Sequence, residues 1–192
     1  MRQILLLFLF TMSINISAQK VYYDRIEKDG SHRVMTTGED FKIGGKKFSF
    51  ALSAQVSQND SVWVLIVSSY EYISSSAEIL LKLGDDENVH LKCFLVNRGE
   101  IKKPGYGVII GNIYFEEESK NVDHYSSTYL IKPEEIDRIV NLGINKIRIS
   151  TGEGLRDKVF RNNNLGKYLA KCKNLILESF NHPHNTDIYD GF

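Results

Sequence analysis

Apolar residues occupy both faces of one stretch of the chain, residues 61–73. At a spacing of two, one face carries Val62, Val64, Ile66, Tyr70 and Tyr72, and the other carries Trp63, Leu65, Val67 and Ile73. A strand with one face in water alternates apolar with polar residues, so this pattern predicts an interior strand that neighbours cover above and below. Ser68, Ser69 and Glu71 indicate that its second half runs toward an edge of the sheet.

Two short dipeptides predict hairpins in the N-terminal part. An Asp-Gly pair at 29–30 lies inside residues 21–37, and a Gly-Gly pair at 44–45 joins the stretches 41–43 and 47–54. Tight two-residue turns need positive φ at both central residues, which these dipeptides tolerate. We therefore expect two antiparallel hairpins before the central strand.

The clearest alternation lies in residues 79–83 and 89–95, which predict a hairpin with one buried face. Residues 98–105 are interpreted as an exposed connection, and residues 106–115 as a single strand with apolar residues on both sides. A further strand is expected over 124–131.

The spacing of apolar residues changes to three and four only near the C-terminus. Pro133 suits the first position of a helix, acidic residues follow in its first turn, and Gly143 suits its left-handed end. A second helix is predicted over the apolar stripe 165–176, with the asparagines at 162–164 as its cap. A short strand over 146–149 separates the two helices.

These elements predict an α+β fold that is predominantly β, with an antiparallel meander of about eight to ten strands. Strands that follow one another without helical crossovers pair antiparallel, so we expect a curled or two-layered sheet with two helices near the C-terminus. No repeat or low-complexity linker divides the chain. We expect a single β-rich domain over 19–180 and a flexible tail over 181–192.

Residues 1–18 have the plan of a secretory signal peptide. Arg2 gives a positive start, residues 4–10 form an apolar run, and Ser17 and Ala18 are small residues before the expected cut. The run is far shorter than the ~20 apolar residues that span a bilayer. We therefore expect export to the periplasm or the cell exterior, and no membrane span once the signal is removed.

The charges of the chain are balanced, with 24 basic and 24 acidic residues among 192. Loss of Arg2 with the signal leaves a net charge of −1. Nucleic-acid-binding proteins carry a basic patch, and this balance excludes that class of partner.

The two cysteines, Cys93 and Cys172, both lie on apolar faces of their predicted elements. An oxidising compartment permits a disulfide between them, and closing so long a loop would stabilise the fold by about 4 kcal/mol. Two buried free thiols fit the same pattern and are the favoured interpretation, because cysteine packs as a small hydrophobic residue. The chain has no Cys-x-x-Cys motif, which disfavours redox chemistry or a cysteine-rich zinc site.

His182 and His184 are the metal-ligand candidates of the sequence, with Asp187 and Asp190 nearby. A metal site needs supporting groups that hold its ligands, and this segment has no apolar pattern to provide them. We therefore favour a mobile tail, and we expect no metal and no cofactor.

The residue types of a catalytic triad occur close together in the sequence, at Asp123, His124 and Ser126. Neighbours in a strand point to opposite faces, so Asp123 and His124 are not expected to cooperate, and no catalytic residue is assigned. The ten tyrosines and Trp63 would suit a carbohydrate or protein surface if several were exposed together, although their strand positions favour packing.

Three stretches together resemble a group of small, uncharacterised exported proteins of Bacteroidetes-type bacteria. They are residues 26–36 (IEKDGSHRVMT), residues 79–85 (ILLKLGD) and residues 129–149, which contain the first predicted helix. The resemblance implies export and a β-rich fold, and it carries over no site residues.

Three functions remain open from the sequence. The favoured one is an exported non-enzymatic domain that binds or scaffolds at the cell envelope, with an envelope protein or a small ligand as partner. The alternative is a small-ligand carrier with a cavity inside a curled sheet, which predicts a large apolar interior. The third is a hydrolase with a dispersed site, which predicts a cleft with convergent acids and bases.

Overall fold

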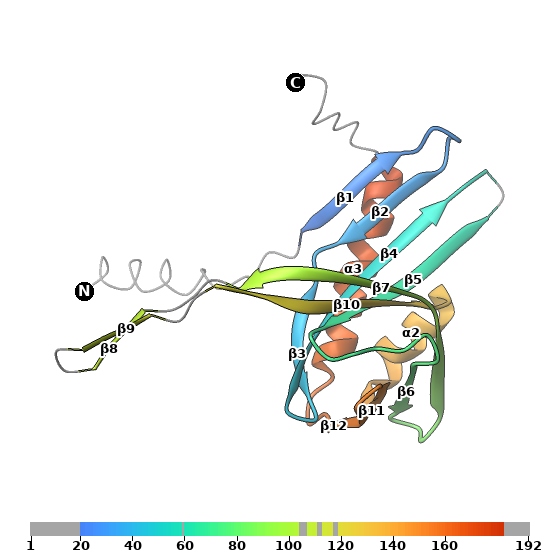
Figure 1. The fold of residues 1–192 in the computed structure, drawn as a ribbon. Coiled ribbons are helices and arrows are strands. Elements are labelled where there is room, and N and C mark those ends of the chain that lie inside the picture. The colour runs from blue at the N-terminus through green and yellow to red at the C-terminus, as the bar shows by residue number, and fades with distance from the viewer. Residues whose placement is uncertain (1–19, 59, 104–106, 111–112, 117–118, 183–192) are drawn as a thin grey trace, which may run out of the picture.

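The computed structural model describes residues 20–58, 60–103, 107–110, 113–116 and 119–182. Ten antiparallel strands form one open sheet, two more form a small separate sheet, and two helices lie near the C-terminus (Figure 1). The predicted fold class is thus confirmed. The expected signal peptide lies outside the described residues, as does the tail from residue 183 onward.

The strands are β1 (Val21–Ile26), β2 (His32–Thr36), β3 (Glu39–Ile43), β4 (Lys46–Val56), β5 (Ser61–Ser69), β6 (Glu78–Leu83), β7 (Asn88–Lys103), β8 (Gly107–Ile110), β9 (Ile113–Glu116), β10 (Lys120–Leu130), β11 (Ile144–Thr151) and β12 (Gly154–Val159). The helices are α2 (Pro133–Leu142) and α3 (Asn164–Asn181). No helix among the described residues is long and apolar enough to cross a membrane.

The large sheet has the order β1-β2-β4-β5-β10-β7-β6-β11-β12. β3 pairs with the opposite end of β4 from the part that pairs with β2. The first residues of β7 pair with β6 and the rest with β10, so this strand joins the two halves of the sheet as it curls (Figure 1).

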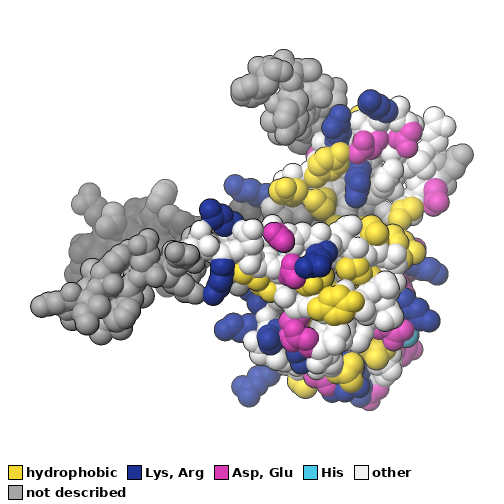
Figure 2. All heavy atoms as spheres, viewed as in Figure 1, with side chains coloured by type: hydrophobic (Ala, Val, Ile, Leu, Met, Phe, Trp, Pro, Cys, Tyr) yellow, Lys and Arg dark blue, Asp and Glu magenta, His cyan; other side chains and the backbone are white. Residues whose placement is uncertain are grey.

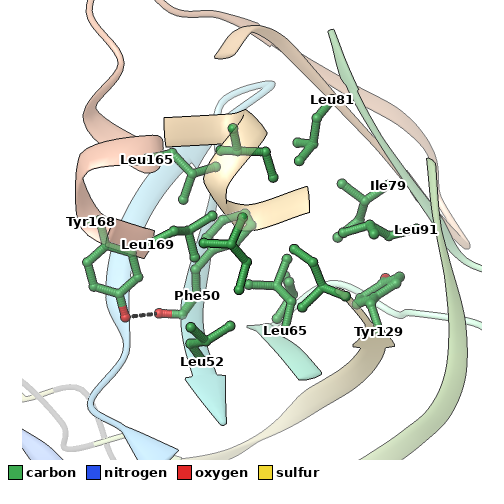
Figure 3. Packing of buried hydrophobic residues seen from close by; sticks show 14 of the residues in the cluster. Phe50, Leu52, Leu65, Ile79, Leu81, Leu91, Tyr129, Leu165, Tyr168 and Leu169 are labelled. Carbon is green, nitrogen blue, oxygen red and sulfur yellow. Dashed lines mark hydrogen bonds between the residues drawn. The ribbon is translucent and has the colours of Figure 1, made fainter. Parts of the chain in front are cut away.

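The curled sheet buries one face, here called the inner face, against the two helices. Helix α3 contacts β1, β2 and β4, and α2 packs on α3. Side chains from the strands and both helices meet in one cluster (Figure 3). Its members include Phe48, Phe50, Leu52, Leu65, Ile79, Leu81, Leu91, Tyr129, Ile136, Leu165 and Leu169.

Strand β5 lies inside the sheet, between β4 and β10, as expected for an interior strand. Trp63, Leu65 and Val67 point to the inner face and are buried. On the opposite face Val62 is 46% exposed, and Val64 is only half-buried. The expectation that β5 is covered above and below is therefore wrong, because both helices lie on the inner side.

The two predicted hairpins are present, but their turns differ. Gly44 and Gly45 both adopt positive φ, 56° and 80°, as a two-residue turn requires. The loop from β1 to β2 is longer, and of its residues only Gly30 has positive φ. There the Asp29 carboxylate accepts hydrogen bonds from the backbone N–H and the hydroxyl of Ser31, which orders the loop.

Two predictions in the middle of the chain are wrong. Residues 98–103 are not a connection but the end of β7, paired with β10. Residues 106–115 are not one strand: β8 and β9 form a hairpin of their own. The pairing of β10 with β5 begins at Tyr125, which lies opposite Ser69. Before it, residues 120–124 of β10 pair only with residues 99–103 of β7, and the two strands project from the sheet as a ribbon (Figure 1).

Both helices begin where local signals placed them, and α2 also ends there. Pro133 occupies the first turn of α2, the Glu135 carboxylate accepts from the Lys132 backbone N–H at 2.8 Å, and Gly143 ends the helix with φ 75°. The Asn163 side chain caps α3 by accepting from the Gly166 backbone N–H at 3.1 Å. Helix α3 continues to Asn181, five residues beyond the predicted stripe.

Polar groups fix α3 to the strands that it covers. The Tyr168 hydroxyl donates to the Phe50 carbonyl at 2.5 Å and lies 2.7 Å from the Thr37 carbonyl (Figure 3). One turn later the Thr36 hydroxyl donates to the Cys172 sulfur at 3.3 Å. These contacts determine how α3 lies along β2 and β4.

A buried ion pair joins the end of β5 to the edge strand β12. Glu71, which follows β5 and is 4% exposed, accepts two-pronged hydrogen bonds of 2.7 to 3.1 Å from Arg156 on β12. Lys46 approaches the same carboxylate at 3.4 Å. Beside this pair the Gly44 backbone N–H donates to the Asp157 carbonyl at 3.0 Å, so β3 and β12 meet.

Glu71→Gln should lower the free energy of unfolding by about 2 to 3 kcal/mol, because it removes the buried charged partner of Arg156 and leaves only the exposed Glu153 beside it. The measurement is denaturant unfolding at neutral pH. Asp123→Asn is the matched control: it breaks the exposed pair with Arg98, and surface pairs contribute less than about 1 kcal/mol. Equal losses in the two variants would contradict the structural role of Glu71.

The stabilisation by Glu71 should also depend on pH. Burial opposes ionisation of Glu71, but the hydrogen bonds and positive charges of Arg156 and Lys46 together outweigh burial and hold its pKa below the ordinary value of 4.5. A carboxyl whose pKa is lower in the folded state stabilises above its unfolded pKa, and this stabilisation is lost as the pH falls through the folded pKa. The stability difference between wild type and Glu71→Gln should be full at pH 7 and shrink below about pH 4.5.

Candidate functional site

The face of the sheet opposite the helices, here called the outer face, carries apolar residues in contact with water. Five of them form the outer patch: Val62, Val64, Ile66, Leu95 and Leu130. Val64 pairs directly with Leu130, and Thr128 pairs with both Ile66 and Leu95, so these side chains are neighbours across β5, β10 and β7. Figure 2 shows hydrophobic side chains spread among polar ones on the side where β7 and β10 lie in front.

Next to the outer patch lies a hollow that is open to solvent and has a volume of about 210 Å³. Its lining side chains come from β3, β4, β5 with the residue after it, and β10. The lining residues are Asp40, Lys47, Ser49, Ser68, Ser69, Tyr70 and His124. We call this site the Tyr70 hollow.

Strand register explains why these residues meet. Asp40 pairs with Ser49, Ser49 with Ser68, and Ser68 with Ser126, which gives one polar row across four strands. Side chains directly opposite one another on one face of a sheet lie within contact distance. The Ser68 hydroxyl donates to the Ser126 hydroxyl at 3.2 Å, so the row is partly hydrogen-bonded within itself.

The charged groups of the Tyr70 hollow neutralise each other. Lys47 Nζ lies 2.6 Å from Asp40 Oδ2, and this hydrogen bond raises the pKa of the Lys47 ammonium group. The Tyr70 and His124 rings stand edge to face, with centroids 5.6 Å apart. The hollow thus offers hydroxyl groups, a paired charge and two aromatic rings.

Ser179, Asp24 and His32 form a second polar cluster, where the end of α3 meets the β1–β2 hairpin. His32 Nε2 donates to Asp24 Oδ1 at 2.5 Å, and the Ser179 hydroxyl donates to the other oxygen of Asp24. In a catalytic triad the histidine stands between serine and aspartate. Here the aspartate stands in the middle, so this cluster fastens α3 to the hairpin and does not activate the serine.

The Tyr129 hydroxyl is a buried polar group without a hydrogen-bond partner among the described residues. The side chain is fully buried, and burial raises its pKa to about 12. Ser127, two residues earlier on the same strand, donates its hydroxyl to the Val67 carbonyl at 3.0 Å. An unpaired buried hydroxyl costs free energy, so Tyr129 differs from the buried Tyr168, whose hydroxyl donates to a backbone carbonyl.

The residues singled out from the sequence do not come together. His182 is exposed at the end of α3, and His184 lies outside the described residues. In the described part of the chain no group of three or more His, Cys, Asp or Glu could hold a metal ion. Cys172 is buried beside Thr36, Cys93 is half-buried on β7, and both are free thiols.

The three residues of β10 that match a catalytic triad each contact a different partner. Asp123 accepts hydrogen bonds from Arg98, His124 lies against Tyr70, and Ser126 bonds to Ser68. His124 is thus a residue of the Tyr70 hollow and not of a triad. Sequence reasoning missed the hollow because its polar row depends on the register of β10 against β5, and Ser68 and Ser126 are 58 residues apart in the chain.

Comparison of the chain with protein-family models, with curated proteins and with solved structures finds no match.

Tyr129→Phe should leave the free energy of unfolding unchanged or raise it by up to about 1 kcal/mol, because it removes an unpaired buried hydroxyl. Tyr168→Phe is the matched control. It removes the donor to the Phe50 carbonyl, and we expect it to cost about 1 to 2 kcal/mol. Denaturant unfolding of both variants checks the pair, and a loss in Tyr129→Phe as large as that in Tyr168→Phe would contradict it.

Proposed function

We propose that the protein is an exported, non-enzymatic domain of the envelope or periplasm that binds an envelope component on the outer face of its sheet. The observation that supports this proposal is the outer patch. Leu130 is 55% exposed and continues into half-buried Val64 and Ile66, on the face that the helices do not cover. Contiguous exposed apolar surface on a folded domain is typical of an interaction site.

The alternative, a small-ligand carrier, needs space inside the curled sheet. The interior is occupied by α3, α2 and large side chains such as Phe48, Phe50 and Tyr129, all fully buried. Ligand pockets that enclose a small molecule are typically ~300–1,000 Å³. The filled interior favours binding on the surface over carriage within.

Export with removal of the signal peptide predicts the N-terminal residue of the mature protein. The protein purified from cells that produce the full chain should begin at Gln19, because the signal is removed after Ala18. Mass spectrometry of the purified protein, together with fractionation of the cells, measures this. A chain that keeps residues 1–18 and stays in the cytoplasmic fraction would contradict export.

Leu130→Asp should weaken binding to isolated envelope by at least about tenfold, because a carboxylate at the centre of the outer patch must lose water on contact. Co-sedimentation of the purified protein with envelope fractions measures the affinity. Leu155→Asp is the matched control: Leu155 is 59% exposed, but it lies on the edge strand β12 away from the patch. Equal binding by the two variants would contradict the outer face as the binding surface.

A further inference from the structure

We propose that the Tyr70 hollow is a carbohydrate subsite that binds one neutral sugar ring of an envelope glycan. This inference rests on the proposed binding function and names its ligand class. It starts from the seven residues that line the hollow, which combine hydroxyl groups, one ion pair and two aromatic rings. Each of these features favours a neutral polyhydroxyl ligand over other classes.

The Lys47–Asp40 pair disfavours ionic ligands. A phosphate or an acidic sugar would need a cation in the hollow, but Lys47 already pairs with Asp40 at 2.6 Å. A cationic ligand would need the same carboxylate that Lys47 holds. A neutral ligand with many hydroxyl groups can share hydrogen bonds with both members of the pair without separating them.

The hydroxyl row supplies the remaining polar contacts. Ser49 and Ser68 lie opposite each other on β4 and β5, and their hydroxyl groups can both donate and accept. A sugar hydroxyl can likewise both donate and accept a hydrogen bond, so it can replace the water that solvates the serine hydroxyl groups. The volume of about 210 Å³ is below the range of roughly 300–1,000 Å³ for drug-sized ligands, and it fits one ring of a chain.

The aromatic rings supply the apolar contact that a sugar ring also needs. Tyr70 is 40% exposed, and His124 stands against its ring edge to face. A tyrosine presents an apolar body and a polar tip, which matches a pyranose with C–H groups on its faces and hydroxyl groups at its edges. His124 restricts the Tyr70 side chain, so less conformational entropy is lost on binding.

The outer patch lies beside the hollow and extends the same surface. Ile66 lies on β5 two residues from Ser68, so the hollow and the patch are continuous along that strand. A glycan chain longer than one sugar would therefore leave the hollow over the apolar side chains of the outer patch. This continuity links the subsite to the binding surface of the proposed function.

The experiment titrates the purified protein with neutral tetrasaccharides of glucose, mannose, galactose and N-acetylglucosamine, and with tetragalacturonate as an acidic probe. Calorimetry and NMR shifts of the His124 ring report binding. We expect at least one neutral tetrasaccharide to bind at micromolar to millimolar concentration. Its affinity should be unchanged between low and high salt, because no charge is neutralised.

Tyr70→Ala should weaken this binding at least tenfold, and Tyr22→Ala, which removes a tyrosine that is 72% exposed on β1, should leave it unchanged. Ser68→Val is a second variant that keeps Tyr70 and removes a hydroxyl of the polar row. We expect it to weaken binding about threefold or more, without loss of folded protein.

The possible failures are distinguishable. If no neutral tetrasaccharide binds, if tetragalacturonate binds better, or if Tyr70→Ala binds as wild type does, the carbohydrate subsite is wrong. Envelope binding that depends on Leu130 but not on Tyr70 would then leave the proposed function standing with a protein partner. Envelope binding that ignores both residues would overturn the function and the subsite together.

Discussion

Packing of α3 against the inner face is the interaction on which the rest of the structure depends. The sheet is open and buries one face, and the apolar side chains of β2 and β4 on that face are covered by a helix. This helix is α3, and the Tyr168 hydroxyl fixes its position on the Phe50 carbonyl. Since both helices lie on this side, the opposite face is left to water and to ligands (Figure 1).

The position of the proposed site on strands has a physical advantage. Sites built on strands hold their side chains more precisely than sites on loops, because ladder hydrogen bonds determine the backbone. Glu71 lies two residues after the end of β5, the strand that carries Ser68, and its pair with Arg156 joins this end to β12. The residue after Tyr70 is therefore anchored in the buried ion pair, while Tyr70 itself faces solvent.

Local signals in the sequence were sufficient for the helices and most strands, but not for the coverage of the sheet or the site. Pro133 and Gly143 define α2 because their backbone preferences act within a few residues. The apolar outer side of β5 was misinterpreted because an exposed binding face and a buried face share the same periodicity. The Gly44–Gly45 turn fixes the pairing of Asp40 with Ser49, yet the approach of His124 to Tyr70 depends on distant strands.

The place of α3 at the end of the chain has a consequence for biosynthesis. All twelve strands are synthesised before α3, so the nascent sheet has no partner for its inner face during almost the whole of translation. Until α3 is made, the apolar inner face of β1, β2 and β4 lacks the helix that covers it, so the core is completed only by the last helix in the described part of the chain.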